Sequence, residues 1–110
     1  MSLIKEMEVT ELAELKGKDD SVRIIDIRQP AELAAGIIPG AEALPMHLIP
    51  LRINELKHEE TLVMVCRSGA RSAQACMFLG QQGYENVFNL RGGMMAWAGS
   101  GLEIGAPVAV

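Results

Sequence analysis

One stretch constrains the fold of this chain more than any other, because it joins an apolar run, a short loop and an amphipathic segment without a gap. The run Thr61–Val65 is apolar, rich in β-branched residues, and has the length of a buried strand. Residues 72–79 have the pattern of a helix that ends near Gly83. The sequence therefore predicts a strand, a tight loop and a helix, with Cys66 where the strand ends.

The loop surrounds this cysteine with groups that favour a negative charge. A helix N-terminus offers unpaired backbone N–H groups and the positive end of its dipole. Small loop residues let successive N–H groups turn inward as an anion nest, and two arginines add permanent positive charge. A structural cysteine would need none of this, so we predict a reactive thiolate with a lowered pKa. The loop residues are Arg67, Ser68, Gly69, Ala70, Arg71 and Ser72.

The spacing within the loop narrows the chemistry. Four residues separate Cys66 from Arg71. Cysteine phosphatases use the same strand, loop and helix with five residues between cysteine and arginine, and that larger ring fits a tetrahedral phosphate. The shorter ring favours a smaller group, such as one extra sulfur on the cysteine.

With its other motifs in order, the chain resembles the rhodanese family of single-domain sulfurtransferases from about Met7 to Ala98. The segments that carry the resemblance are Ile24-Ile25-Asp26-Ile27-Arg28, Gly36-Ile37-Ile38-Pro39-Gly40-Ala41, the loop 66–72, Gly83-Tyr84-Glu85-Asn86-Val87, and Leu90-Arg91-Gly92-Gly93 with Trp97. The resemblance implies a three-layer α/β/α domain with a five-stranded, mostly parallel sheet. The alternation of strand and helix patterns agrees with this α/β class.

The resemblance also implies roles for individual residues. Cys66 would carry a persulfide between donor and acceptor, the loop residues 67–72 would bind substrate, and Asp26 and Arg28 would support the structure around the loop. The family commonly has histidine where this chain has Ile37, and often an aromatic residue at Leu33. This departure concerns the substrate entrance or loop support rather than the reaction.

The expected function is transfer of a sulfane sulfur from a small anionic donor such as thiosulfate to cyanide or a thiol, with no cofactor and no metal. Two other classes stay open. One is a persulfide carrier, or a regulatory binding module, that serves a partner protein. The other is a cysteine phosphatase or arsenate reductase on the same fold, which the short loop disfavours.

The length and charge of the chain agree with a single domain that binds an anionic substrate. A chain of 110 residues corresponds to one domain, 1–110, with a core at about 7–98 and a tail at 99–110. The net charge of −4 argues against nucleic-acid binding. Six of the fourteen acidic residues precede residue 21, and only two follow Thr61, which suits an anionic substrate at Cys66.

Other sequence features bear on location and on the second cysteine. No apolar run reaches membrane-spanning length, and the first residues lack a secretory pattern, so we expect a cytoplasmic protein unless a native leader was removed. The two cysteines form no metal pattern. Cys76 falls among apolar helix residues and is predicted to pack in the core. For Arg91 the sequence leaves two alternatives open, a position at the rim of the substrate pocket and one outside it.

The remaining elements follow from periodicity and from turn residues. We expect a short strand at Glu8-Val9, a helix over 11–16 capped by Thr10, and a strand over 22–27. Pro30 should begin a helix that runs to 35, with Glu32 a candidate partner of Arg28. A short strand at 43–44, a helix over 46–56 with Pro50 as a candidate interruption, a strand over 87–90 and a helix over 94–98 complete the pattern.

Overall fold

The strands pair side by side in one parallel sheet. In the computed structural model, which describes residues 4–19 and 21–106, the strand order is β1-β5-β4-β2-β3. All four pairings between these strands are parallel. The strands are β1 (Lys5–Met7), β2 (Val22–Asp26), β3 (Glu42–Ala43), β4 (Thr61–Val65) and β5 (Val87–Leu90).

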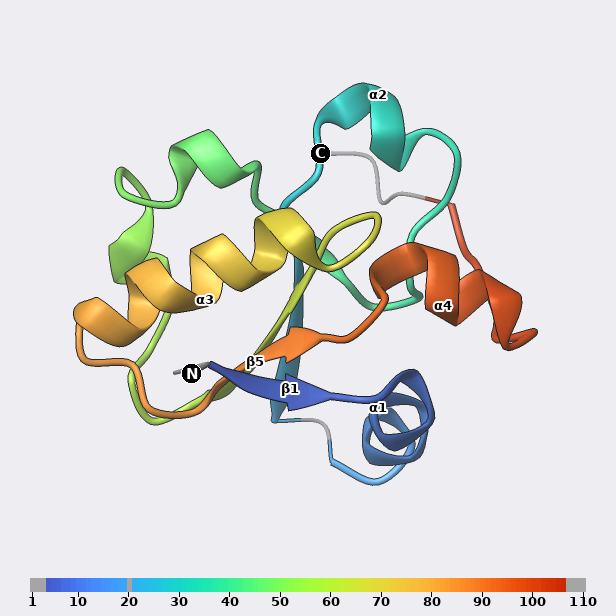
Figure 1. Cartoon of the computed structure of the whole chain (residues 1–110), viewed down its shortest axis with the longest axis horizontal. Coiled ribbons are helices and arrows are strands. Elements are labelled where there is room, and N and C mark those ends of the chain that lie inside the picture. The colour runs from blue at the N-terminus through green and yellow to red at the C-terminus, as the bar shows by residue number, and fades with distance from the viewer. Residues whose placement is uncertain (1–3, 20, 107–110) are drawn as a thin grey trace.

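Helices cover both faces of this sheet. The helices are α1 (Val9–Lys16), α2 (Pro30–Leu33), α3 (Ala70–Gln81), α4 (Gly93–Gly99) and the 3-10 turns η1 (Met46–Leu48) and η2 (Ile53–Glu55). In Figure 1, α3 lies on one side of the strands, and α1 and α4 lie on the other. The three-layer α/β/α prediction is therefore confirmed, and the described part of the sheet is wholly parallel.

The side chains of β4 alternate between two apolar clusters, one on each face of the sheet. Val63 and Val65 pack with residues of α1 and α4. Leu62 and Met64 pack with residues of α3 on the opposite face. Both faces of the strand are buried, which is why its sequence is an unbroken apolar run. Cys66 continues the Leu62–Met64 side, so strand parity directs the cysteine toward α3.

The first strand and the start of the first helix lie earlier in the sequence than predicted. The first strand is Lys5–Met7, and Val9 already belongs to α1. The helix is capped by Glu8 rather than by Thr10, in a capping box in which Glu8 and Glu11 each accept from the other's backbone N–H. A glutamate can satisfy the first N–H groups as a threonine would, so the acidic pair defines the helix start.

The predicted helix over 46–56 was also wrong, because the segment forms only the two 3-10 turns η1 and η2. Pro50 lies between them and lacks the backbone N–H that a continuous helix would donate to the carbonyl of Met46. The other strands lie within one residue of their predicted bounds. Helix α2 ends at Leu33, two residues earlier than expected, while α3 begins at Ala70, two residues earlier than the predicted helix.

The predicted tail is fastened to the domain along its described part. Gly105 and Ile37 exchange two backbone hydrogen bonds of 2.8 and 2.9 Å, and the indole of Trp97 donates to the carbonyl of Glu103 at 2.7 Å. Residues 107–110 lie outside the described residues. Among the helices of residues 4–19 and 21–106, none is long and apolar enough to cross a membrane.

Candidate active site

Cys66 lies directly after β4, the middle strand of the sheet, at the edge where the parallel strands end. Only 1% of the residue is exposed. Beside it, the backbone pairing with β4 continues one residue past the end of β2, since Ile27 N–H donates to the carbonyl of Val65 at 2.9 Å. Ligands of parallel α/β sheets bind at this edge, so the position agrees with the site predicted from the loop.

Three donors surround the sulfur of Cys66. The backbone N–H of Gly69 lies 3.1 Å from Sγ, the backbone N–H of Ser72 lies 3.4 Å away, and the Ser72 hydroxyl lies 3.3 Å away. Gly69 caps α3 with a φ of 99°, a left-handed conformation that favours glycine. The loop therefore curls around the sulfur as the anion nest predicted from its small residues.

Helix α4 fixes the opposite side of the loop. The N–H groups of Met94 and Met95 donate to the carbonyl groups of Cys66 and Arg67, at 2.9 and 3.0 Å. Gly93 makes this contact possible, because a Cβ there would lie 2.3 Å from the carbonyl oxygen of Cys66. The carbonyl groups of Cys66 and Arg67 thus accept from α4, while the N–H groups of Gly69 and Ser72 donate to the sulfur.

These contacts lower the pKa of the Cys66 thiol. Burial opposes ionisation, but hydrogen bonds from the Ser72 hydroxyl and from the backbone N–H groups of Ser72 and Gly69 outweigh it. The pKa is lowered as predicted, and the expected backbone N–H groups are among the largest causes, whereas neither expected arginine is. Backbone and hydroxyl donors lower the pKa, while Arg71 is already paired with an acid.

Arg71 forms a two-pronged ion pair with Glu32 of α2. Its two terminal nitrogens lie 2.8 Å from the two carboxylate oxygens, and the guanidinium holds the pKa of Glu32 at about 2. Glu32 was expected beside Arg28, and that expectation was wrong, since Arg28 reaches only the Glu32 backbone carbonyl at 3.3 Å. Arg71 therefore ties the helix α3 to α2.

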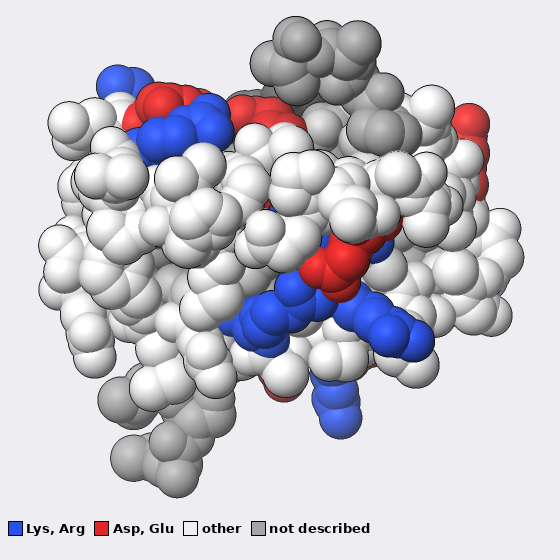
Figure 2. Space-filling view, turned by 90° about the horizontal axis from the view of Figure 1, so that it is seen from above, with Lys and Arg blue, Asp and Glu red and all other residues white. Residues whose placement is uncertain are grey.

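Arg67 is exposed, and no acid within residues 4–19 and 21–106 pairs with its side chain. Figure 2 views the molecule from the side of α2 and shows basic groups gathered next to an acidic group on that face. Of the two loop arginines, Arg67 is thus the one whose guanidinium is available to an incoming anion. Ser68 and Ala70 are also exposed, while Gly69 and Ser72 are buried against the sulfur.

Asp26 and Arg28 form a fully buried ion pair beside the loop. The Arg28 guanidinium contacts both Asp26 oxygens at 2.8 to 3.1 Å and donates to the carbonyl of Gly36 at 2.8 Å. The two side chains are 1% and 7% exposed. Their contacts run between the end of β2 and the segment after α2, and their role in supporting the loop stays a prediction.

The positions that depart from the family pattern pack in the core. Ile37 and Leu33 are buried in the apolar cluster that also contains α1 and α4 residues. An aliphatic side chain at these places adds to the core rather than to a polar entrance. Arg91 pairs with Glu8 at 3.4 Å on the exposed surface, so its guanidinium faces the N-terminus of α1.

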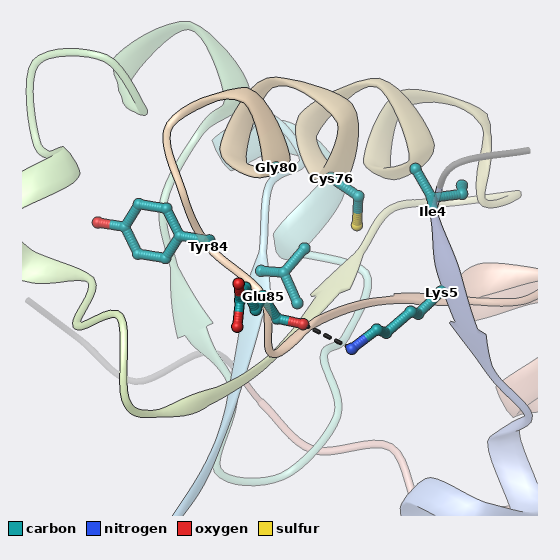
Figure 3. Close-up of a pocket in the computed structure, with 7 residues that line it drawn as sticks. Ile4, Lys5, Cys76, Gly80, Tyr84 and Glu85 are labelled. Atoms are coloured by element: carbon teal, nitrogen blue, oxygen red, sulfur yellow. Dashed lines mark hydrogen bonds between the residues drawn. The ribbon is translucent and has the colours of Figure 1, made fainter.

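Cys76 is buried in α3, as the sequence predicted. Figure 3 shows its sulfur pointing from α3 toward the strands, at a hollow of about 350 Å³ that Lys5 and Glu85 also line. Burial raises the pKa of this thiol to about 12. Cys66 does not border this hollow. The two cysteines therefore differ sharply, one prepared for ionisation and the other protected from it.

The sequence reasoning missed Asn89, which lies in β5 and is 2% exposed. Its side-chain carbonyl accepts from the Ser72 hydroxyl at 2.5 Å, and its amide donates to the carbonyl of Gly69 at 3.1 Å. The available signal was a lone amide within the apolar strand Val87–Leu90, because buried polar side chains require partners.

In the described part of the chain, no three metal-binding side chains gather.

A thiolate-stabilising loop at the carboxyl edge of a parallel sheet defines a cysteine-dependent α/β domain. The rhodanese-like domain model matches residues 8–100, and the chain belongs to this family. It is 50% identical to a sulfurtransferase of Allochromatium vinosum over 96% of this chain and 98% of that protein. It is 38% identical to the thiosulfate sulfurtransferase GlpE of Pseudoalteromonas translucida, over 84% and 88% of the two chains.

A solved structure gives the same answer for the fold. The crystal structure of a rhodanese-like domain protein from Staphylococcus aureus superposes with a TM-score of 0.83 at 36% identity. The superposition covers 94% of this chain and all of that one. The two curated relatives are named sulfurtransferases, which supports a sulfurtransferase role for this chain.

Proposed function

We propose that this protein transfers a sulfane sulfur through a persulfide on Cys66, from an anionic donor such as thiosulfate to cyanide or a thiol. The observation that carries the proposal is the ring of three donors on the Cys66 sulfur. A ring with four residues between Cys66 and Arg71 holds one added sulfur more closely than a tetrahedral oxyanion. The GlpE relative, named for thiosulfate, supports this choice of donor.

In the first step the Cys66 thiolate attacks the outer sulfur of thiosulfate. The new bond joins Cys66 Sγ to that sulfur, the sulfur–sulfur bond of thiosulfate breaks, and its electron pair leaves with sulfite. The charge of −3 is conserved, because a thiolate and a dianion give a persulfide anion and a dianion. The loop N–H groups stabilise the anionic sulfur, as the donors of an oxyanion hole stabilise an oxygen.

Arg67 is the residue we assign to the sulfonate end of the donor, because it is exposed and has no acidic partner among the described residues. Arg71 is engaged with Glu32, so its role is to orient the loop. In the second step cyanide or a thiolate attacks the outer sulfur, and the Cys66 thiolate leaves. The two half-reactions form a ping-pong scheme.

Steady-state kinetics with thiosulfate and cyanide test the proposal. We expect parallel double-reciprocal lines for the wild type, similar rates for Cys76→Ser, and loss of thiocyanate formation in Cys66→Ser. Cys76→Ser is the matched control, because it removes the other buried thiol. Activity that persists in folded Cys66→Ser would overturn the proposal.

A further inference from the structure

The Ser72 hydroxyl faces two acceptors and can satisfy only one. Its oxygen lies 3.3 Å from Cys66 Sγ and 2.5 Å from Asn89 Oδ1. A serine hydroxyl carries a single proton. Ser72 is fully buried and Asn89 is 2% exposed, so water does not replace either partner. Whichever acceptor takes the proton deprives the other of it.

The orientation of the Asn89 amide follows from its neighbours. Its nitrogen lies 3.1 Å from the carbonyl of Gly69 and 3.2 Å from a carboxylate oxygen of Glu6, both of which only accept. Its oxygen must then face Ser72. Two strands thus fix the amide, because Asn89 belongs to β5 and Glu6 to β1.

From this geometry we propose that Asn89 is a positioning residue that competes with the Cys66 sulfur for the single hydroxyl proton of Ser72. While Cys66 is a neutral thiol, the proton lies on the Asn89 side. When the sulfur becomes anionic, the hydroxyl turns to the sulfur and Asn89 Oδ1 loses its donor. The proposal rests on the proposed function only in taking Cys66 as the sulfur that reacts.

The competition gives Asn89 an effect opposite in sign to that of an ordinary supporting residue. In Asn89→Leu the sulfur is the only acceptor left to the Ser72 hydroxyl among the described residues, so the hydrogen bond from Ser72 stabilises the thiolate more. The carbonyl of Gly69 keeps a partner, since Ala73 N–H also donates to it at 3.1 Å. If Asn89 merely held the loop in shape, its loss would misaim the N–H groups and disfavour the thiolate.

The test is the pH profile of iodoacetamide alkylation of Cys66, followed by intact mass. Other charges near the sulfur are Arg67, Arg71 with Glu32, Asp26 with Arg28, and Glu6 beyond Asn89. Arginines stay charged across this range, and burial raises the pKa of Cys76 to about 12. The assay covers about two pH units on either side of neutrality, from about pH 5 to about pH 9. Alkylation in this range therefore reports on Cys66.

We expect Asn89→Leu to move the midpoint of this profile lower by at least about half a pH unit. Ser72→Ala should move the midpoint higher. In the Ser72→Ala background, adding Asn89→Leu should not lower the midpoint. Asn86→Leu is the matched control, because this exposed asparagine precedes the same strand. A midpoint in Asn89→Leu that is unchanged or higher, or a fall that persists without the Ser72 hydroxyl, would overturn the proposal.

A second measurement decides the matter in the wild type should Asn89→Leu fail to fold. The chain has three asparagines, at positions 54, 86 and 89. The side-chain amide signals of Asn89, and of neither other asparagine, should shift in NMR spectra with the midpoint of Cys66 alkylation. An Asn89 signal that stays constant through that midpoint would overturn the proposal. Neither measurement requires sulfur transfer, so failure of the proposed function would be seen separately in the thiosulfate assay.

Discussion

Replacing Arg28 by methionine tests how much the buried ion pair supports the active loop. The substitution keeps most of the side-chain volume and removes the guanidinium from Asp26, which is 1% exposed. Asp26 would keep one hydrogen bond, from the backbone N–H of residue 28 at 3.1 Å. It would lose the contacts of 2.8 to 3.1 Å with the guanidinium, and Gly36 would lose its donor.

The size of the effect follows from the burial of the charge that remains. Removing one partner of a buried ion pair costs about 3–5 kcal/mol, because the other charge stays without compensation. Domains of this size are stable by only about 5–15 kcal/mol, and each kcal/mol corresponds to about 4–8 °C in Tm for small domains. We therefore expect Arg28→Met to lower Tm by well over about 10 °C.

Urea unfolding followed by the fluorescence of Trp97 gives the free energy directly, since this is the only tryptophan and it is buried. Arg52→Met is the control, because Arg52 pairs with Glu55 on the exposed surface. The double variant Asp26→Leu/Arg28→Met should recover much of the loss, because apolar residues can replace a buried pair. Equal losses for Arg28→Met and Arg52→Met would refute this reasoning.

Three further predictions concern the loop and its partners. Arg67→Ala should raise KM for thiosulfate and lower kcat/KM by a factor that corresponds to about 1–3 kcal/mol of lost transition-state stabilisation. Arg67→Lys should recover only part of kcat/KM, because an ammonium lacks the planar fork of a guanidinium. Inserting a glycine between Gly69 and Ala70 should lower sulfur transfer in a protein still folded by circular dichroism, since misplacement of about 1 Å can cost about a hundredfold, and weak aryl phosphate hydrolysis is expected. The stabilisation of the fold by ionised Glu32 should be complete above about pH 4.5, the ordinary pKa of its carboxyl, and should be lost as the pH falls toward about 2. Urea unfolding at a series of pH values should show this loss in the wild type and not in Glu32→Gln.

Each of these has an outcome that counts against it. Unchanged kcat/KM in Arg67→Ala at low and moderate salt would remove Arg67 from donor binding. Wild-type turnover of an aryl phosphate that depends on Cys66 and exceeds sulfur transfer would favour a phosphatase. Identical acid sensitivity in wild type and Glu32→Gln would show that the pair with Arg71 does not stabilise the domain.

The centre of the fold follows from the sequence because local and tertiary preferences agree there. The run Thr61–Val65 is buried on both faces, so its apolar character predicted both the strand and its bounds. The loop was predictable because the small residues after Cys66 point to one geometry, with Gly69 in a left-handed conformation. One stretch was thus enough to predict the strand, the loop and the start of the helix around Cys66.

What the sequence could not provide were contacts between distant elements. Glu32 could have paired with Arg28 or Arg71, and only the placement of α2 against α3 decides for Arg71. Asn89 is a single polar residue in a strand, and its partner Ser72 lies seventeen residues earlier in the chain. The segment 46–56 has helical composition, but Pro50 divides it into two short turns.

The central claim is that Cys66 alone carries the transferred sulfur, and intact mass after mixing with thiosulfate tests it most directly. The wild type and Cys76→Ser should each gain one sulfur atom, about 32 Da, while Cys66→Ser should remain unchanged. Cyanide should then restore the original mass in both labelled proteins. A gain of this size in folded Cys66→Ser, or no gain in the wild type, would contradict the account.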